Sequence, residues 1–242
     1  AIMIGKTNTP EFGAGSQTFN QVFGETRNPY DLSKTCGGSS GGGAVSVACR
    51  MLPFADGSDL GGSLRNPTNF CNVVGFRPSV GRVPSWPSES GWNSFAVDGP
   101  IARTVDDTAL MLSVLAGPDL RSPISLPENG SIFRQSLERN SKGVRIAWSA
   151  DLGGLPVDSR VTETLEAQRA VFEDLGCIVE EGFPDFSDAD EIFKNFRAWF
   201  YEMKLASLLP EHRDKMKETV VWNIEAGMKL SGPELGRAEV KR

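Results

Sequence analysis

Histidine is nearly absent from this sequence, which contains a single one, His212, in 242 residues. Any Ser-His-Asp or Cys-His mechanism would have to use that residue as its base. His212 lies in the polar stretch LLPEHRDKMKETVVWNI, whose pattern indicates a helix with this side chain on a solvated face. We therefore expect any nucleophilic chemistry in this chain to use a base other than histidine.

Long apolar runs are also missing, and none reaches the ~18 residues that a membrane-spanning helix needs. The opening residues AIMIGKTNTPEFG do not have the basic-then-apolar order of a secretory signal. The 25 lysine and arginine residues are scattered, and the net charge is −6, so the sequence has no basic stripe of the kind that binds nucleic acid. We expect a cytoplasmic protein that binds neither a membrane nor nucleic acid.

Cysteine is sparse as well. The four cysteines, Cys36, Cys49, Cys71 and Cys177, lie far apart, with no C-x-x-C pair and no histidine cluster. Structural zinc requires closely spaced ligands, so we expect no metal site and four reduced thiols. Cys36 adjoins a glycine-rich run, where we interpret it as a small packed residue and not as a nucleophile.

Three stretches of the chain differ in composition. Residues 1–117 are rich in Gly, Ser, Thr and Asn, and they hold nearly every unusual motif. Residues 118–142 carry three prolines and few apolar pairs, which indicates a long surface connection. Residues 143–242 show ordinary helix and strand patterns. We interpret the three as parts of a single catalytic domain spanning 1–242.

The later stretch indicates the fold class. Residues 144–148 form a short apolar strand pattern, residues 158–176 a helix pattern, and CIVEEG a returning strand. The helix would start at Asp158 or Ser159 and stop at Gly176. Its predicted apolar face consists of Val161, Leu165, Val171, Phe172 and Leu175. Strand, helix and strand in this order imply a right-handed crossover, so we predict an α/β fold with a mixed β-sheet core and helices on both faces.

A second helix is predicted over residues 104–117. Thr104 and Asp107 resemble a capping box, and Gly117 would end the helix. The residues expected to pack inward are Ala109, Leu110, Ser113 and Val114.

Two glycine-rich segments carry the motifs that suggest chemistry. Residues 36–43 read CGGSSGGG, and residues 56–67 read DGSDLGGSLRNP. Because glycine costs stability, dense glycine beside serine indicates backbone that approaches something closely or adopts conformations closed to other residues.

Two common motifs explain these segments poorly. Neither segment matches the phosphate-binding G-x-x-x-x-G-K-[ST] or the dinucleotide-binding G-x-G-x-x-G pattern. The nucleophile-elbow pattern G-x-S-x-G fits around Ser39 and around Ser40, but it arises easily by chance in a glycine-rich run. It would also require His212 as its base.

Taken together, the two segments resemble the amidase signature family. The sequence GGSSGG is followed by a helix pattern and then by a strand ending in GSDLGGSLRNPTNFCNVVGFRPS, with Ser39 and Ser63 at the usual spacing of that family. The flanks GKTNTPEFGAGS and VDGPIARTVDDTALMLSVLAGPD agree as well. The resemblance is dense over residues 1–117 and looser beyond.

The resemblance implies a Ser-cis-Ser-Lys catalytic triad without metal or organic cofactor. Ser63 matches the nucleophile, which forms an acyl-enzyme with the carbonyl of an amide. Ser39 matches the bridging serine, which follows a cis peptide bond with Gly38 and relays a proton between the lysine and Ser63. The backbone N–H groups of Leu60, Gly61, Gly62 and Ser63 match the oxyanion hole.

The lysine of that triad has no counterpart in this sequence. In the family it lies further upstream than this chain extends, and Lys6 belongs to the separate GKTN segment. The chain also stops short of the C-terminal portion usual in the family. We therefore interpret it as an internal fragment, a poor catalyst when isolated.

Two further pairs of interpretations stay open. Asp59 and Arg65 could bind a substrate carboxylate, although a buried ion pair that supports the Ser63 loop is the favoured interpretation. Ser40 could donate a hydrogen bond near the site or act as a helix N-cap.

The predicted function is hydrolysis of a small-molecule carboxylic amide through Ser63. The spacing W-P-x-x-x-x-W in SWPSESGW and the segment GPIART look most like stand-alone bacterial amidases. The alternatives are the glutaminase subunit of a tRNA-dependent amidotransferase and a non-catalytic relative that kept the fold. A homodimer is one oligomeric state that remains open.

Overall fold

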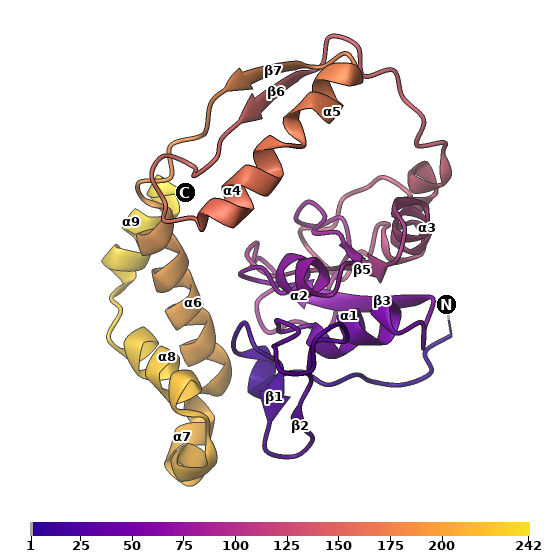
Figure 1. Cartoon of the computed structure of the whole chain (residues 1–242). Coiled ribbons are helices and arrows are strands. Elements are labelled where there is room, and N and C mark those ends of the chain that lie inside the picture. The colour runs from indigo at the N-terminus through magenta and orange to yellow at the C-terminus, as the bar shows by residue number, and fades with distance from the viewer. Residues whose placement is uncertain (1) are drawn as a thin grey trace. The chain divides into compact units, whose positions relative to one another are not determined.

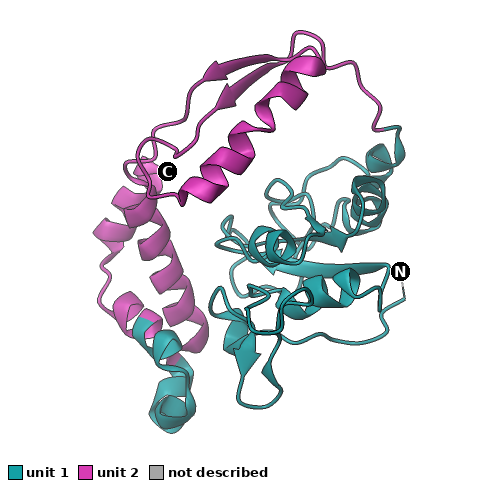
Figure 2. Cartoon of the chain, viewed as in Figure 1, with its two compact units in different colours: residues 1–136, 207–222 teal, residues 137–206, 223–242 magenta. Residues whose placement is uncertain are grey.

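The computed structural model describes residues 2–242, which form two compact units (Figure 2). Unit 1 comprises the chain up to residue 136 together with residues 207–222, and unit 2 comprises residues 137–206 and 223–242. The boundary at residues 136 and 137 falls within the predicted surface connection. Both units contain helices and strands, so the α/β class is confirmed (Figure 1). Membership of a single catalytic domain stays a prediction.

Unit 1 contains the two glycine-rich segments. Its elements, in chain order, are η1 (Glu11–Gly13), β1 (Phe19–Asn20), β2 (Gly24–Glu25), α1 (Gly41–Ala48), β3 (Phe54–Asp59), α2 (Arg65–Phe70), β4 (Val74–Gly75), β5 (Val97–Ala102), α3 (Val105–Leu115), η2 (Gly130–Arg134), α7 (Leu209–His212) and η4 (Arg213–Lys215). Helix α8 (Glu218–Met228) begins in unit 1 and ends in unit 2, and η3 (Ala206–Leu208) also spans the boundary.

The main sheet of unit 1 has three antiparallel strands in the order β3-β5-β4. Gly57 of β3 lies directly opposite Gly99 of β5. A side chain at either position would crowd the Leu64 side chain, since added Cβ atoms would lie 3.1 and 2.8 Å from its methyl carbons. The two facing glycines therefore make room for Leu64, which packs with Val47 and Ile101 in a fully buried cluster.

Helix α3 starts as predicted, but only Ser113 of its four predicted inward residues is buried. The Thr104 hydroxyl accepts a hydrogen bond from the Asp107 backbone, which confirms the cap. Leu110 and Val114, predicted to pack inward, are nearly half exposed. The buried residues of this helix are Thr108, Leu112 and Ser113. Hydroxyl side chains can face inward here because those of Thr108 and Ser113 donate to backbone carbonyls one turn earlier.

Unit 2 contains the predicted strand-helix-strand stretch. Its elements are β6 (Arg145–Trp148), α4 (Ser159–Glu166), α5 (Arg169–Asp174), β7 (Ile178–Glu181), α6 (Ala189–Leu205) and α9 (Gly232–Lys241). Strands β6 and β7 pair in parallel, as the crossover requires. The strands of the described residues thus belong to three small sheets, two antiparallel and one parallel.

The helix predicted over residues 158–176 is two helices, α4 and α5, separated at residues 167 and 168. Asp158 caps the first by accepting from the Arg160 backbone, and Gly176 follows the second with a φ of 85°. The predicted apolar face is present but is not buried among the described residues: its five side chains are 37–57% exposed. Periodicity identified the face correctly, but burial depends on what packs against it.

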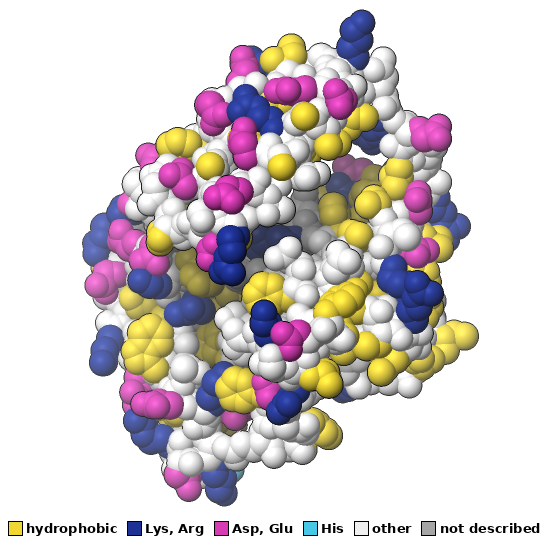
Figure 3. Space-filling model, viewed as in Figure 1, with side chains coloured by type: hydrophobic (Ala, Val, Ile, Leu, Met, Phe, Trp, Pro, Cys, Tyr) yellow, Lys and Arg dark blue, Asp and Glu magenta, His cyan; other side chains and the backbone are white. Residues whose placement is uncertain are grey.

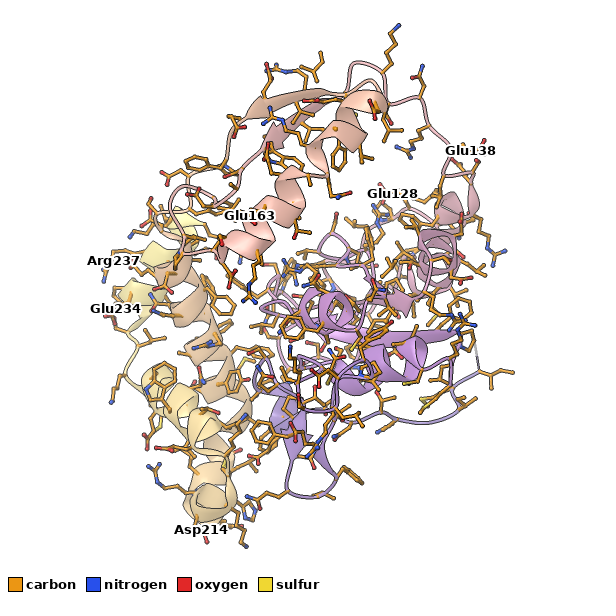
Figure 4. The ribbon with its side chains drawn as sticks, in the orientation of Figure 1. Glu128, Glu138, Glu163, Asp214, Glu234 and Arg237 are labelled. Carbon is orange, nitrogen blue, oxygen red and sulfur yellow. The ribbon has the colours of Figure 1, made fainter. Side chains whose placement is uncertain are left out.

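Helices α6 and α9 of unit 2 are joined by charged side chains. Lys241 near the end of α9 donates to Asp188 and Glu191 around the start of α6, at 2.8 and 2.6 Å. Helix α9 begins with a capping box between Ser231 and Glu234, which is labelled in Figure 4. Such reciprocal bonds satisfy two backbone N–H groups that have no partner within the helix.

The surface of the chain mixes charges of both signs. On the face drawn in Figure 3, acidic and basic side chains are interspersed, with apolar side chains between them. Within residues 2–242, no helix is both long enough and apolar enough to cross a bilayer.

Two helical glycines provide a matched stability test. An added Cβ at Gly227 in α8 would lie 2.2 Å from the Ala198 carbonyl oxygen of α6, whereas nothing lies within 4 Å of one at Gly236 in α9. We expect Gly227→Ala to lower the free energy of unfolding by about 1–3 kcal/mol through overpacking. Gly236→Ala should raise it by about 0.5–1 kcal/mol, because alanine favours an exposed helix. Urea unfolding of both variants measures this, and a stabilising Gly227→Ala would contradict the packing.

Candidate active site

Residues Ser39 and Ser63 lie in two loops that pack directly on each other. The Ser40 backbone N–H donates to the Ser63 carbonyl at 3.3 Å, and the Asn66 side-chain amide donates to the Gly38 carbonyl at 3.4 Å. The first loop leads into α1, and the second joins β3 to α2. The structure therefore brings together two segments that a helix and a strand separate in the sequence.

The peptide bond between Gly38 and Ser39 is cis, as the family resemblance implied. A side chain at Gly38 would collide with the chain upstream, since an added Cβ would lie 2.9 Å from the Gln17 backbone nitrogen. Ser39 is buried and Ser63 is half-buried. Among residues 2–242, neither serine hydroxyl takes part in a hydrogen bond, so both remain available to a substrate or to another group.

The Asp59 carboxylate at the end of β3 organises the Ser63 loop. It is fully buried and accepts the backbone N–H groups of Gly62 at 2.8 Å and Leu64 at 3.2 Å. Arg65 binds both carboxylate oxygens, at 3.0 and 3.1 Å. Arg77 donates to the same carboxylate at 3.0 Å and to the Asp59 carbonyl. The favoured interpretation of Asp59 and Arg65 as a supporting ion pair is therefore confirmed.

This environment keeps Asp59 ionised. Burial pushes the pKa of Asp59 upward, but the hydrogen bonds from Arg65 and Gly62 and the positive charges of Arg65 and Arg77 outweigh it. The pKa of Asp59 consequently lies below its ordinary value. The hydrogen bonds from Arg65 raise the pKa of that guanidinium in turn. A buried carboxylate with two cations and two backbone donors has its charge and its lone pairs satisfied.

Three of the four predicted oxyanion-hole donors are free in this loop. The backbone N–H groups of Leu60, Gly61 and Ser63 have no acceptor in the part of the chain that the structure describes. The N–H of Gly62 differs, because it donates to Asp59. Gly62 has a φ of 119°, a conformation that a side chain would strain. Adjacent free N–H groups in a turn can hold a negatively charged oxygen.

Ser40 and Cys36 flank Ser39 in the first loop. Ser40 stands at the N-cap position of α1, but its hydroxyl forms no cap bond and instead pairs with the Ser58 backbone at 3.3 Å. Cys36 is fully buried against Ala44 and Cys71, and burial raises the pKa of its thiol. It is a packed residue, as expected. All four cysteines are free in the structure.

His212 forms no hydrogen bond with Ser39, Ser40 or Ser63 within the described residues. It ends α7 and is exposed, two residues before Asp214, which Figure 4 shows at the tip of that helical segment. This arrangement agrees with a solvated histidine. Nor does the described part of the chain contain a group of three or more His, Cys, Asp or Glu side chains arranged for a metal ion.

Sequence reasoning missed three residues that shape the site. Arg77 supplies the second cation for Asp59 and also donates to the Phe95 carbonyl at 2.9 Å. Asn66 bridges the two loops. The buried Thr18 donates to the Gly37 carbonyl at 2.8 Å. All three lie within the stretch that resembles the family, but no local pattern indicates their partners, which are distant in sequence.

The Asp59 cluster generates a stability prediction with a matched control. Because the folded-state pKa of Asp59 is depressed, its contribution is present above the unfolded value of ~3.9 and is lost as the pH falls through the folded value. Asp59→Asn should therefore lower the free energy of unfolding at pH 7 by about 1–3 kcal/mol, since a neutral amide cannot accept from both arginines and both backbone N–H groups as the carboxylate does. The difference from wild type should shrink below about pH 4.

Asp98 on β5 is the control. Burial, with the nearby Asp56 charge, raises the pKa of Asp98, so its ionised form destabilises the fold at neutral pH. Asp98→Asn should then be neutral or stabilising at pH 7. Denaturant unfolding at pH 7 and pH 3.5 separates the two cases, and equal effects of both substitutions would refute the role given to the Asp59 cluster.

Known proteins share this arrangement of sequence and structure. The family model described as Amidase matches residues 1–229. An acylamidase of Rhodococcus erythropolis is 35% identical over 243 aligned residues, which cover 100% of this chain and 51% of that protein. One component of a glutamyl-tRNA(Gln) amidotransferase from Lactiplantibacillus plantarum is 41% identical over 75% of this chain and 37% of its own length.

Among solved structures, a bacterial aryl acylamidase of the amidase signature family superimposes with a TM-score of 0.89 at 31% identity, covering 98% of this chain and 51% of that one. The chain thus spans about half the length, or less, of the relatives it matches. The family model covers nearly all of it, and the loops that carry Ser39 and Ser63 are packed together in its structure. This chain belongs to the amidase family.

Proposed function

We propose that the protein hydrolyses carboxylic amides through an acyl-enzyme on Ser63. One observation carries this proposal. The Ser39 and Ser63 loops are joined by hydrogen bonds, beside three backbone N–H groups with no acceptor in residues 2–242. Membership of the amidase family and the resemblance to two acylamidases support the reaction class.

The first half of the proposed reaction forms the acyl-enzyme. The Ser63 hydroxyl oxygen attacks the amide carbonyl carbon while its proton passes to the Ser39 hydroxyl. Ser39 passes its own proton to a lysine that lies outside this chain. The N–H groups of Leu60, Gly61 and Ser63 donate to the developing oxyanion, and each such donor typically contributes about 10²–10³ in rate. The proton returns along the same path to the leaving amine, which departs.

The second half releases the acid. Water attacks the Ser63 ester, with Ser39 again relaying the proton, and Ser63 regains its hydroxyl as the carboxylic acid leaves. Asp59 does not touch the substrate in this scheme. It holds Gly62 and Leu64, so the donors and the nucleophile keep their geometry before the substrate binds, which is the condition for efficient charge stabilisation.

A glutaminase role inside a tRNA-dependent amidotransferase is the second candidate, favoured by the 41% identity with a component of such an enzyme. That match covers 75% of this chain, whereas the acylamidase aligns over all of it, so the stand-alone amidase is the better proposal. Co-purification with partner proteins would support the second candidate.

For the stand-alone amidase, we also propose a bacterial, cytoplasmic enzyme that binds no nucleic acid and needs no cofactor. A homodimer is its simplest assembly.

A fluorophosphonate tests the nucleophile. We expect the full-length protein that contains this chain to be labelled on Ser63, because the reagent reacts with an activated serine hydroxyl. Peptide mass mapping locates the label, and Ser63→Ala should abolish both label and amide hydrolysis. The exposed Ser131 provides the control, since Ser131→Ala should keep both. Label on Ser40 would instead support the nucleophile elbow with His212. If no serine of the folded protein is labelled, membership of the amidase family would indicate common ancestry and not amide hydrolysis.

The Ser39 relay predicts a second loss. Ser39→Ala should lower kcat by about 10²–10⁴, the usual contribution of a positioned acid-base group, because Ser63 loses its route for the proton. Circular dichroism and the melting temperature check that the variant folds like wild type. Steady-state hydrolysis of an anilide substrate measures the rate, and near-normal turnover would rule out the relay.

A further inference from the structure

Lys217 belongs to unit 1 but lies far along the chain from the serine loops. It occupies the start of α8, where its carbonyl accepts the Val220 N–H at 2.8 Å and the Val221 N–H at 3.2 Å. Val220 and Val221 are buried. Because its carbonyl accepts the N–H groups of two buried residues, the backbone of Lys217 is fixed to α8.

Two groups of Lys217, its backbone N–H and its ammonium, contact the segment of residues 11–19. Its backbone N–H donates to the Glu11 carboxylate at 2.9 Å, which satisfies an N–H at the helix start with an acid from a distant segment. Its ammonium donates to the Ala14 carbonyl at 3.1 Å and lies 4.5 Å from the centre of the Phe19 ring, a cation–π distance. The ammonium also approaches Gly15 so closely that an added Cβ there would lie 3.3 Å away.

The same segment forms one wall beside Ser39. An added Cβ at Gly13 would lie 4.0 Å from the Ser39 hydroxyl oxygen, so the backbone of Gly13 is next to that group. Further along the segment, Thr18 donates to the Gly37 carbonyl, and the Ser16 carbonyl accepts from Asn66 at 3.4 Å. Residues 11–19 are thus held by Lys217 at one side and by the serine loops at the other.

The segment has little regular structure of its own. Gly13, Gly15 and Phe12 have positive φ values of 70°, 125° and 51°, and its only element before β1 is the short η1. A segment of this kind has few intrinsic hydrogen bonds, so its position depends on external contacts. The two bonds and the ring contact from Lys217 are such contacts.

We propose that Lys217 is a positioning residue for acyl transfer, which holds residues 11–19 against the Ser39 loop. This inference rests on the proposed function for its catalytic consequence. Lys217 does not touch the serines. It fixes the wall beside the Ser39 hydroxyl, where a displacement of about 1 Å can cost on the order of 10²-fold in rate.

The test uses three variants of the full-length protein. Lys217→Met keeps the apolar stem but removes the charge and the donor, Lys217→Arg keeps both, and Lys215→Met removes an exposed lysine outside these contacts. We expect Lys217→Met to lower kcat about 10- to 100-fold with a much smaller change in KM, because the reacting groups and not the binding surface are displaced. Lys217→Arg should restore most of the rate, and Lys215→Met should behave as wild type.

Hydrogen exchange measured by mass spectrometry gives a readout that does not require activity. Peptides covering residues 11–19 should exchange faster in Lys217→Met than in wild type or Lys215→Met, with the melting temperature nearly unchanged. Faster exchange with unaltered kcat would overturn the positioning role, and unaltered exchange would overturn it as well. An inactive, unlabelled wild type would overturn the proposed function instead, and the exchange data would then still decide whether Lys217 holds the segment.

Discussion

A single buried carboxylate, that of Asp59, determines the shape of the loop that carries Ser63. It ends β3, accepts two backbone N–H groups from the loop and binds two arginines. Such a group would be costly to bury unpaired, but here each oxygen has several donors. Because Gly62 and Leu64 are bonded to it, the chain between them has little freedom. The N–H groups of Leu60, Gly61 and Ser63, which have no acceptor among residues 2–242, follow from that geometry.

The site is assembled from segments that are distant in sequence. Leu64 fits into the space left by Gly57 and Gly99, which fixes the Ser63 loop on the sheet. Asn66 and Ser40 join this loop to the Ser39 loop, and residues 11–19 close against Gly38. Lys217 then supports residues 11–19 from the start of α8. Many of these contacts are made to backbone groups, so the arrangement depends on the path of the chain as well as on the side chains of Asp59, Leu64 and Lys217.

The sequence predicted the elements better than it predicted their faces. The Thr104 cap, the Asp158 cap and the parallel strands β6 and β7 are as expected, because capping and strand patterns are local. The predicted inward face of α3 was right at Ser113 but wrong at Leu110 and Val114. Thr108 is buried as well, since its hydroxyl donates to a carbonyl within the helix turn. The single helix over residues 158–176 was wrong too, as no sequence signal marks the break at residue 167.

By itself the sequence determined the family and the α/β class. It also identified Ser39 and Ser63 as candidate catalytic residues and Asp59 and Arg65 as an ion pair. These follow from dense motifs in a fixed order, in which glycine and serine leave few alternatives. Only the tertiary structure decided that Arg77 completes the Asp59 cluster, that the Gly62 N–H is committed to it, and that Lys217 contacts residues 11–19. Their partners lie 18, 3 and more than 200 positions away. Side-chain reach and loop geometry set such contacts once the chain is folded, and they leave no periodic trace in the sequence.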